Sequence, residues 1–332
     1  MTDLTAATAT AAVPGPRAGP WLSFGLRRLG RFAVSLWLLV TMAFLMIQLI
    51  PGDPVRAALG LTAPAELVNA RRAALGLDHP LWLQYFDYLG GLVRGDFGTS
   101  MLSGVPVSQV IGDRLPATLE LALPAFAAVI VVAVPLGLLF AVLTRGGRRR
   151  GGELAFTSTT VLLAAIPEFL VAVALVAFFA VQLGWFPVAG HEGSGSLVLP
   201  VIALALGPAS VLSRIVRVET LSVLGNDFIR TARAKRLPAR LVYARHALPN
   251  ALTATLTLGG MMLTGLVAGT VLVENVFAWP GLGSTIAQSI LQKDYPLVQG
   301  IVLVYGVGVL LVNLAVDVLL AVLDPRSTIR EG

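Results

Sequence analysis

Long apolar stretches separated by polar connections run through most of the sequence. A helix needs about 20 mainly apolar residues to cross a bilayer. Six stretches meet that need, and they cover residues 32–50, 119–143, 155–183, 197–216, 251–273 and 300–323. Pro124, Pro135 and Pro167 fall within them, but spanning helices tolerate proline where neighbouring helices satisfy the freed carbonyls. The pattern predicts an all-α membrane protein with six transmembrane helices.

These stretches divide the chain into regions. The expected order is a disordered cytoplasmic tail over residues 1–25, a first transmembrane helix over 26–50, an external region over 51–117, a five-helix core over 118–324 that includes a cytoplasmic loop over 217–250, and a cytoplasmic tail over 325–332. The first apolar run begins only at Phe32 and no small-residue cleavage site follows it, so we expect a retained helix instead of a cleaved signal peptide.

Composition and charge place this protein in a membrane. Hydrophobic residues make up 56% of the chain and charged residues 13%, whereas soluble domains carry about 25% charged residues. Arginines gather before the first span, at residues 145–150 and at residues 217–245, but residues 184–196 have none. Basic loops stay in the cytoplasm, so both termini are predicted to be cytoplasmic. The net charge of +6 reflects these loops beside the lipid headgroups, and no feature predicts nucleic-acid binding.

Residues 51–117 form the longest connection, with nearly balanced charges that suit a folded and solvated element. The run that begins at Ala65 predicts a short helix with Leu67, Val68 and Leu75 facing inward. A loop of this length either contacts an external partner or caps the spans.

The sequence argues against an enzyme. Neither Lys235 nor Lys293 follows a glycine, so neither completes the GK[ST] end of a phosphate-binding loop. His79, His191 and His246 lie far apart and form no HExxH pair of metal ligands. The absence of cysteine excludes disulfides and thiolate sites. We expect no catalytic residue, metal site or bound cofactor in this chain, so any ATP hydrolysis takes place in another one.

The segment from Asn226 to Leu252 is the most informative stretch, because it predicts a basic helix–break–helix between two spans. Asn226 is a favourable N-cap, and Asp227 suits the positive end of a helix dipole. Pro238 cannot continue the first helix, so a second short helix is expected before Pro249 opens the fifth span.

Helical spacing gives the first of these helices two faces. Its predicted apolar face comprises Leu221, Leu224, Phe228 and Ala232, and its basic face comprises Arg230, Arg233 and Arg236. Anionic headgroups would account for the arginines alone, whereas an apolar face favours docking into a groove of another protein. We expect docking, with Phe228, Arg230, Arg233 and Lys235 as the contact surface.

Eleven short segments, in one order from about Leu26 onward, resemble the membrane subunit of dipeptide/oligopeptide-type ABC importers. They are LIPGDP (49–54), LGLDHPLWLQY (75–85), GDFGTS (95–100), RLPATLEL (114–121), IPEF (166–169), LGWFPVAG (183–190), FIRTARAK (228–235), RHALPNAL (245–252), VENVFAWPGLG (273–283), DYPLVQG (294–300) and NLAVDVLLAVLDPR (313–326). Each is weak alone, but their shared order is specific, and it implies the type I ABC importer permease fold.

The resemblance implies partners and a coupling site. A similar sister permease subunit would complete a heterodimer, two ABC ATPase subunits carrying ATP and Mg²⁺ would bind the cytoplasmic loops, and an external substrate-binding protein would deliver substrate. The implied ATPase-coupling residues are Asp227, Phe228, Arg230, Thr231, Ala232, Arg233, Ala234, Lys235, Arg236, His246 and Pro249. The family usually has glycine where this chain has Arg236, which would shift the break toward Pro238 or add a charged contact.

Polar residues within the predicted spans are pathway candidates, because a charge at mid-bilayer costs about 2.5–3.5 kcal/mol and must face protein or water. Glu168 either lines the pathway, where it could meet a peptide amino group, or forms a structural hydrogen bond. Asn313 and Asp317 are further candidates, with a structural role favoured for Asp317. The resemblance adds Glu274 and Trp279, in a turn at the pathway mouth.

The substrate follows mainly from the resemblance. Related importers move dipeptides, longer peptides, glutathione, opines or nickel, and the missing metal-ligand clusters favour peptides over nickel. A stand-alone channel or ion-driven transporter would need paired intramembrane charges or inverted repeats, and neither is evident. A scaffold subunit would tolerate charge reversal in the cytoplasmic loop. The expected function is half of the translocation pathway of an ATP-driven peptide importer.

Overall fold

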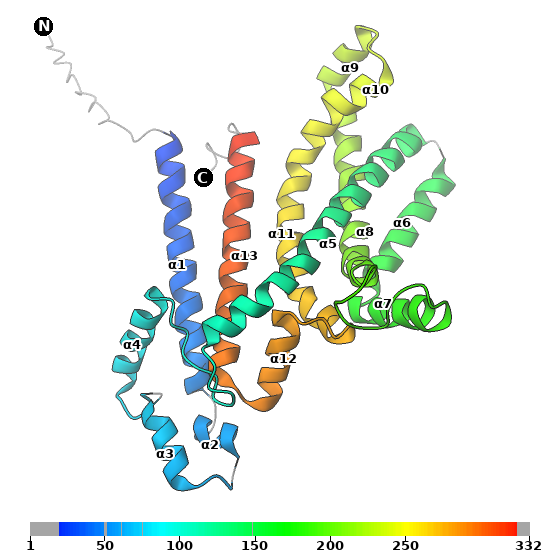
Figure 1. Ribbon diagram of the computed structural model, residues 1–332. Helices are drawn as coiled ribbons and strands as arrows, with labels where there is room; N and C mark the ends of the chain where they lie inside the picture. Colours follow the sequence, from blue (N-terminus) through cyan, green and yellow to red (C-terminus); the bar gives the residue numbers. More distant parts are fainter. Residues whose placement is uncertain (1–19, 50–51, 61, 75, 148, 324–332) are drawn as a thin grey trace, which may run out of the picture.

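A computed structural model describes residues 20–49, 52–60, 62–74, 76–147 and 149–323, and within these ranges the chain is helical without strands (Figure 1). The helices are α1 (Pro20–Gln48), α2 (Pro54–Leu59), α3 (Ala65–Ala74), α4 (Leu81–Val93), α5 (Val107–Thr144), α6 (Arg150–Ala165), α7 (Glu168–Leu175), α8 (Val198–Leu224), α9 (Asp227–Ala234), α10 (Ala239–Leu241), α11 (Leu248–Val276), α12 (Leu282–Gln292) and α13 (Tyr295–Leu323). A 3₁₀ turn spans Arg145–Gly147, and π-helical turns span Val176–Gln182 and Val242–Ala247. Most of the predicted N-terminal tail and the predicted C-terminal tail lie outside the described residues.

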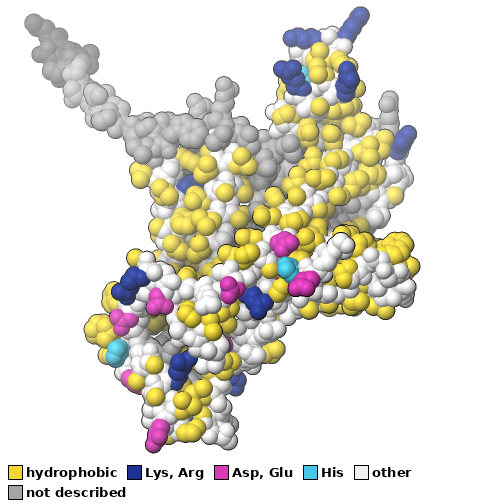
Figure 2. All heavy atoms as spheres, viewed as in Figure 1, with side chains coloured by type: hydrophobic (Ala, Val, Ile, Leu, Met, Phe, Trp, Pro, Cys, Tyr) yellow, Lys and Arg dark blue, Asp and Glu magenta, His cyan; other side chains and the backbone are white. Residues whose placement is uncertain are grey.

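Four helices, α1, α5, α8 and α13, are each long and apolar enough to cross a membrane. Helix α11 runs over 29 residues, and Thr264–Val276 is an apolar helical stretch within it. Large apolar side chains such as Trp37 on α1 and Val131 on α5 are exposed, and apolar surface covers much of the long helices (Figure 2). Such surface suits contact with lipid or another membrane subunit. The count of six spans and the cytoplasmic termini stay predictions.

The predicted third span, residues 155–183, is not one straight helix. Helices α6 and α7 meet at a bend of 93°. The bend follows from Pro167, because a residue that precedes proline is driven out of the α region, and Ile166 is extended at φ −77° and ψ 122°. This stretch is therefore a broken span or a re-entrant segment.

The observed helices extend beyond the predicted apolar stretches. Helix α5 begins at Val107, 12 residues before Leu119, and at 38 residues it is about 57 Å long. Helix α8 continues to Leu224, past the predicted end at Val216. A hydropathy pattern identifies only the apolar part of a helix. The backbone hydrogen bonds of the helix continue into polar sequence until a helix-breaking residue ends them.

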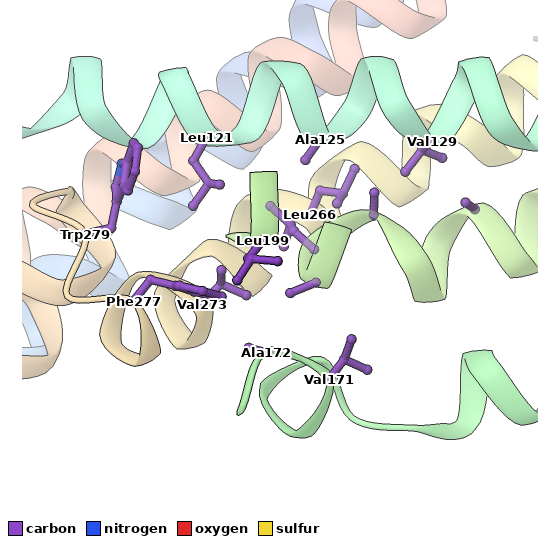
Figure 3. Close-up of a cluster of buried hydrophobic side chains, with 14 of the residues drawn as sticks. Leu121, Ala125, Val129, Val171, Ala172, Leu199, Leu266, Val273, Phe277 and Trp279 are labelled. Carbon is purple, nitrogen blue, oxygen red and sulfur yellow. The ribbon is translucent and has the colours of Figure 1, made fainter. Parts of the chain in front are cut away.

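Helix α8 lies at the centre of the main core and packs against α5, α6, α7 and α11. Leu121, Leu199 and Leu266, from three different helices, meet in this core (Figure 3). The close approach of α5 to α8 depends on Gly137 of α5. A methyl group on Gly137 would lie 2.5 Å from the backbone oxygen of Ser213 and 2.6 Å from the Cβ of Val216, both on α8.

The predicted external region folds against the ends of the long helices (Figure 1). Val68 of α3 is buried as predicted, but Leu67 is 51% exposed, and Leu75 lies outside the described residues. Arg72 of α3 pairs with Asp53, which begins α2. Although burial opposes it, this hydrogen bond and those from backbone N–H groups lower the pKa of Asp53.

Two further contacts hold the loop at Ser100 and helix α1 against α13 and the residue before it. The buried Asp294 accepts hydrogen bonds from the Ser100 hydroxyl and from the backbone N–H of Met101, at 2.9 Å for the latter. At the opposite end, Arg28 of α1 pairs with Asp317 of α13 at 2.7 Å, so the two helices lie side by side (Figure 1). The pathway candidate Asp317 thus forms an ion pair with α1 in this conformation.

We predict that Gly137→Ala destabilises the α5–α8 contact by about 1–3 kcal/mol, because the added methyl group forces the helices apart. The measurement is the thermal unfolding midpoint of the protein in detergent. Gly112→Ala is the matched control on the same helix, since nothing lies within 4 Å of a methyl group there. Equal midpoints for the two variants would contradict the close-packing role of Gly137.

Candidate functional site

The candidate coupling residues gather at one tip of the molecule. Helices α8 and α11 rise beyond their neighbours, and α9 and α10 close the gap between their ends (Figure 1). We call residues 226–241 the tip element. Lys and Arg side chains collect around it, at the end opposite the external region (Figure 2).

The inner side of the tip element is apolar. Ile229 and Ala232 of α9 are buried at 0% and 5% exposure, against Leu224, Val242 and Ala247. These contacts fix α9 onto the ends of α8 and α11. Because both neighbours are long helices of the core, a force applied to α9 reaches the membrane part directly.

The predicted apolar face was partly wrong. Ala232 is buried as expected, but Phe228 is 42% exposed and Ile229 takes the inner position. The prediction continued the 3.6-residue spacing from Leu221 and Leu224 through residue 228, whereas α8 ends at Leu224 and α9 starts anew at Asp227. The interruption shifts the register of the face.

The outer side of the tip element is basic and exposed. Its exposed candidates are Asp227, Phe228, Arg230, Thr231, Arg233, Ala234, Lys235 and Arg236. Arg230 pairs with Asp227 at 3.3 Å, but both side chains are largely in solvent, so this pair adds little stability. Arg233, Lys235 and Arg236 form no ion pair with any residue that the structure describes. Their charges are available to a partner.

Two local predictions for this segment need correction. Asn226 begins α9 with extended backbone, but its side chain makes no capping hydrogen bond. The second helix is not a separate short one. It runs from Ala239 through the π-helical turn into α11, so Pro249 lies near the start of α11 within a continuous helix and His246, half-buried, lies in the π turn. Because proline has no N–H to donate, this continuous helix lacks one backbone hydrogen bond at Pro249.

A buried polar cluster holds the turn between α11 and α12, at the external end. Glu274 is fully buried, and its carboxylate accepts hydrogen bonds from the Thr118 hydroxyl at 2.8 Å and the Ser284 N–H at 2.9 Å. Trp279, also fully buried, donates its indole N–H to the backbone oxygen of Ala117 at 2.8 Å. In this conformation neither Glu274 nor Trp279 presents surface to a substrate. Both instead attach the turn to α5.

The remaining pathway candidates lie apart from one another. Asn313 of α13 accepts a hydrogen bond from Thr264 of α11 at 3.4 Å. Glu168 is the first residue of α7, directly after the bend, and not in the middle of a straight helix. Among the described residues no three His, Asp or Glu side chains are grouped so as to hold a metal ion.

Comparison with known proteins gives these features a family. Residues 133–329 match the family described as "Binding-protein-dependent transport system inner membrane component". Residues 21–122 match the N-terminal part of such membrane components. The chain belongs to this family. It is a membrane (permease) subunit of an ABC importer, located in the bacterial inner membrane.

Curated relatives resemble the permease along nearly its whole length. It is 36% identical over 305 residues to the glutathione transport system permease protein GsiC of Salmonella typhimurium, covering 92% of this chain and 98% of that one. It is 38% identical over 309 residues to a putative peptide transport system permease protein of Brucella suis, covering 91% and 97%.

Solved structures support the fold. Two crystal forms of the MetNI methionine ABC transporter in inward-facing conformations match with TM-scores of 0.52 and 0.54, at 21% and 18% identity. Each match covers 65% of the permease and 97% of the other chain. The type I importer fold implied by the sequence resemblance is confirmed.

Sequence reasoning missed Arg217 as a structural residue of the permease. It was counted among the basic residues of the cytoplasmic loop, yet it lies within α8 and is 9% exposed. Its guanidinium donates to the Thr144 hydroxyl at 2.9 Å and pairs with Glu153 at 2.7 Å. Arg217 thereby joins α5, α6 and α8 below the tip element. No glycine or proline lies between Arg217 and Leu224, seven residues later. The lack of a helix breaker could have indicated that α8 continues past Arg217.

The departure at Arg236 has a structural consequence. Arg236 keeps a positive φ of 55°, the conformation that glycine adopts without cost, so the break stays at this residue and does not shift to Pro238. An L-residue in this region carries a strain of about 1–2 kcal/mol.

We predict that Arg236→Gly stabilises the tip element by about 1 kcal/mol, because glycine removes that strain. Slower hydrogen–deuterium exchange of the amides of residues 227–241 would be the measured result. Arg233→Gly is the control, since Arg233 lies in the last turn of α9 and glycine within a helix costs about 1 kcal/mol. The two variants should thus shift exchange in opposite directions; a shift in the same direction would contradict the strain at Arg236.

Proposed function

We propose that the permease forms half of the translocation pathway for small peptides and pairs with a similar sister subunit. The relatives' names support the substrate class, since one names glutathione, itself a tripeptide, and another names peptides. Helices α1 and α13 carry exposed apolar side chains, and these could contact a second membrane subunit.

The observation that carries the coupling role is the two-sided tip element. Its inner side is fixed to α8 and α11 through Ile229 and Ala232, while its outer side offers Phe228, Arg233 and Lys235 to a partner. A separate ATPase subunit would bind this outer side, carry ATP and Mg²⁺, and leave the permease without a cofactor of its own.

Transport would then follow from the two states of the ATPase pair. Closure of two ATPases on ATP moves the two tip elements toward each other, and α8 and α11 carry this motion into the membrane. ATP binding favours one state of the permease only if the contacts at the tip differ between states. An external binding protein would deliver the peptide to the state that opens outward.

Uptake by the complete complex in proteoliposomes tests the substrate. Labelled glycylglycine, glutathione, an opine and Ni²⁺ are compared, with the binding protein outside and ATP inside. ATP-dependent accumulation of glycylglycine or glutathione supports the peptide class. Accumulation of Ni²⁺ or the opine alone would overturn it. Uptake by the permease without any ATPase would favour a stand-alone transporter.

We predict that Arg230→Glu and Arg233→Glu each lower ATP-dependent uptake at least about tenfold, because reversal of one charge places repulsion where the ATPase binds. Recovery of the ATPase with the tagged permease should fall in parallel, while the amount of permease in the membrane stays unchanged. Arg149→Glu is the matched control, since Arg149 is exposed in the α5–α6 connection, away from the tip element. Normal uptake by both tip variants would remove the coupling role.

A further inference from the structure

The bend between α6 and α7 lies within the membrane part of the permease. Helix α6 starts at Arg150 in the basic connection and runs for 16 residues, so the bend is about 24 Å from that end. A bilayer core is about 30 Å thick. The bend therefore falls in the external third of the membrane if α6 starts at the cytoplasmic surface.

Irregular backbone at this depth needs cover. Non-helical backbone is tolerated within a membrane only where protein buries it or where it lines a water-filled cavity. The outer side of this bend is not covered by the chain itself, because Ala165, Ile166 and Pro167 are all exposed. A second subunit or an aqueous route must therefore lie next to it.

Glu168 has no hydrogen-bond or ion-pair partner among the described residues, although it is half-buried. Its carboxylate lies against Gly269 of α11, where an added methyl group would come within 2.9 Å of both carboxylate oxygens, and Leu204 of α8 lies beside it. Glu274 shows the contrast, since it is an acid whose carboxylate accepts two hydrogen bonds within this chain. A structural hydrogen bond, the alternative considered for Glu168, is not formed in this conformation.

The face of α11 next to this carboxylate carries a second glycine, Gly265. Gly265 precedes Gly269 by four residues, so both glycines share one face of the helix. Gly265 is exposed, and nothing lies within 4 Å of a methyl group placed on it. Gly265 therefore leaves room beside α11 one helical turn from Gly269, which the Glu168 carboxylate contacts.

We propose that Glu168 lines the aqueous route and receives the terminal ammonium group of a peptide substrate. A carboxylate within the bilayer is unfavourable unless a cation or water meets it, and a peptide in the route carries such a cation at one end. Gly269 makes room for the carboxylate itself, and Gly265 leaves room for a ligand one helical turn away. This inference rests on the proposed peptide substrate, and it makes Glu168 a specificity-determining residue inside the membrane.

The test uses the absence of cysteine from the natural chain. Gly265→Cys introduces a single thiol into this chain, and the labelling of this chain within the complete complex by a water-soluble maleimide is timed. We expect labelling, slowed several-fold by glycylglycine but not by N-acetylglycylglycine, which lacks the ammonium group. In the Gly265→Cys/Glu168→Gln pair the protection by glycylglycine should disappear. Equal protection with and without the Glu168 carboxylate, or by both peptides, would overturn the proposal.

Uptake kinetics give a second reading. Glu168→Gln should raise the half-saturating concentration of glycylglycine about tenfold, the loss expected for a hydrogen bond to a charged group, with little change in maximal rate. Glu192→Gln, which alters an exposed acid of the external loop, is the matched control and should behave as the natural chain. A fall in maximal rate alone would assign Glu168 a structural role and overturn the proposal.

Further variants keep the test decisive if Glu168→Gln fails to assemble. Gly269→Ala retains the carboxylate but displaces it, and it should weaken protection of the thiol by glycylglycine; full protection would count against the site. Failure of the proposed function gives a different result from failure of the Glu168 site. If the complex with the natural chain accumulates no peptide, the proposed peptide substrate is wrong. If a thiol at position 265 never reacts, the proposed aqueous route is wrong.

Discussion

The fold depends on the close packing of α8 against its neighbours. In lipid there is no hydrophobic drive between helices, so association relies on dispersion contacts between surfaces that fit closely. Gly137 lets α5 approach the backbone of α8 at Ser213 and Val216. Helix α8 also contacts α6, α7 and α11. Helices α7 and α11, which carry Glu168 and Glu274, are therefore placed by reference to this one helix.

Polar interactions are concentrated at the two ends of the bundle. At the basic end, Arg217 joins Thr144 and Glu153, and Arg145 donates to the backbone oxygen of Leu224 at 3.2 Å, so the foot of the tip element is held by charge-assisted hydrogen bonds. At the external end, Glu274 holds the α11–α12 turn, and Asp294 holds the loop at Ser100. Partly buried charges at these points are all partnered, which is the condition for tolerating them at low dielectric.

The placement of polar contacts at the two ends of the bundle affects how motion could pass through the permease. The tip element is fixed on its inner side and basic on its outer side, so a partner can move α8 and α11 without unfolding them. The turn at Trp279 is fixed to α5 by buried hydrogen bonds. Between these two ends lies the bend at Pro167, followed directly by Glu168, whose carboxylate has no hydrogen-bond or ion-pair partner in the part of the chain that the structure describes. In a family of importers, the less constrained middle is where the route for substrate is expected to open.

The sequence by itself determined the membrane location, the helical class, the family and the position of the basic segment, because apolar length, arginine placement and ordered motifs are local properties of the chain. It also predicted the exposed candidates Arg230, Arg233 and Lys235. Only the tertiary structure decided that Ile229 rather than Phe228 faces inward, that Arg217 is buried, and that Asp317 pairs with Arg28. These outcomes depend on where helices break and which distant residues they meet. Spacing along one helix cannot specify a contact between residues 28 and 317, whereas packing in three dimensions does.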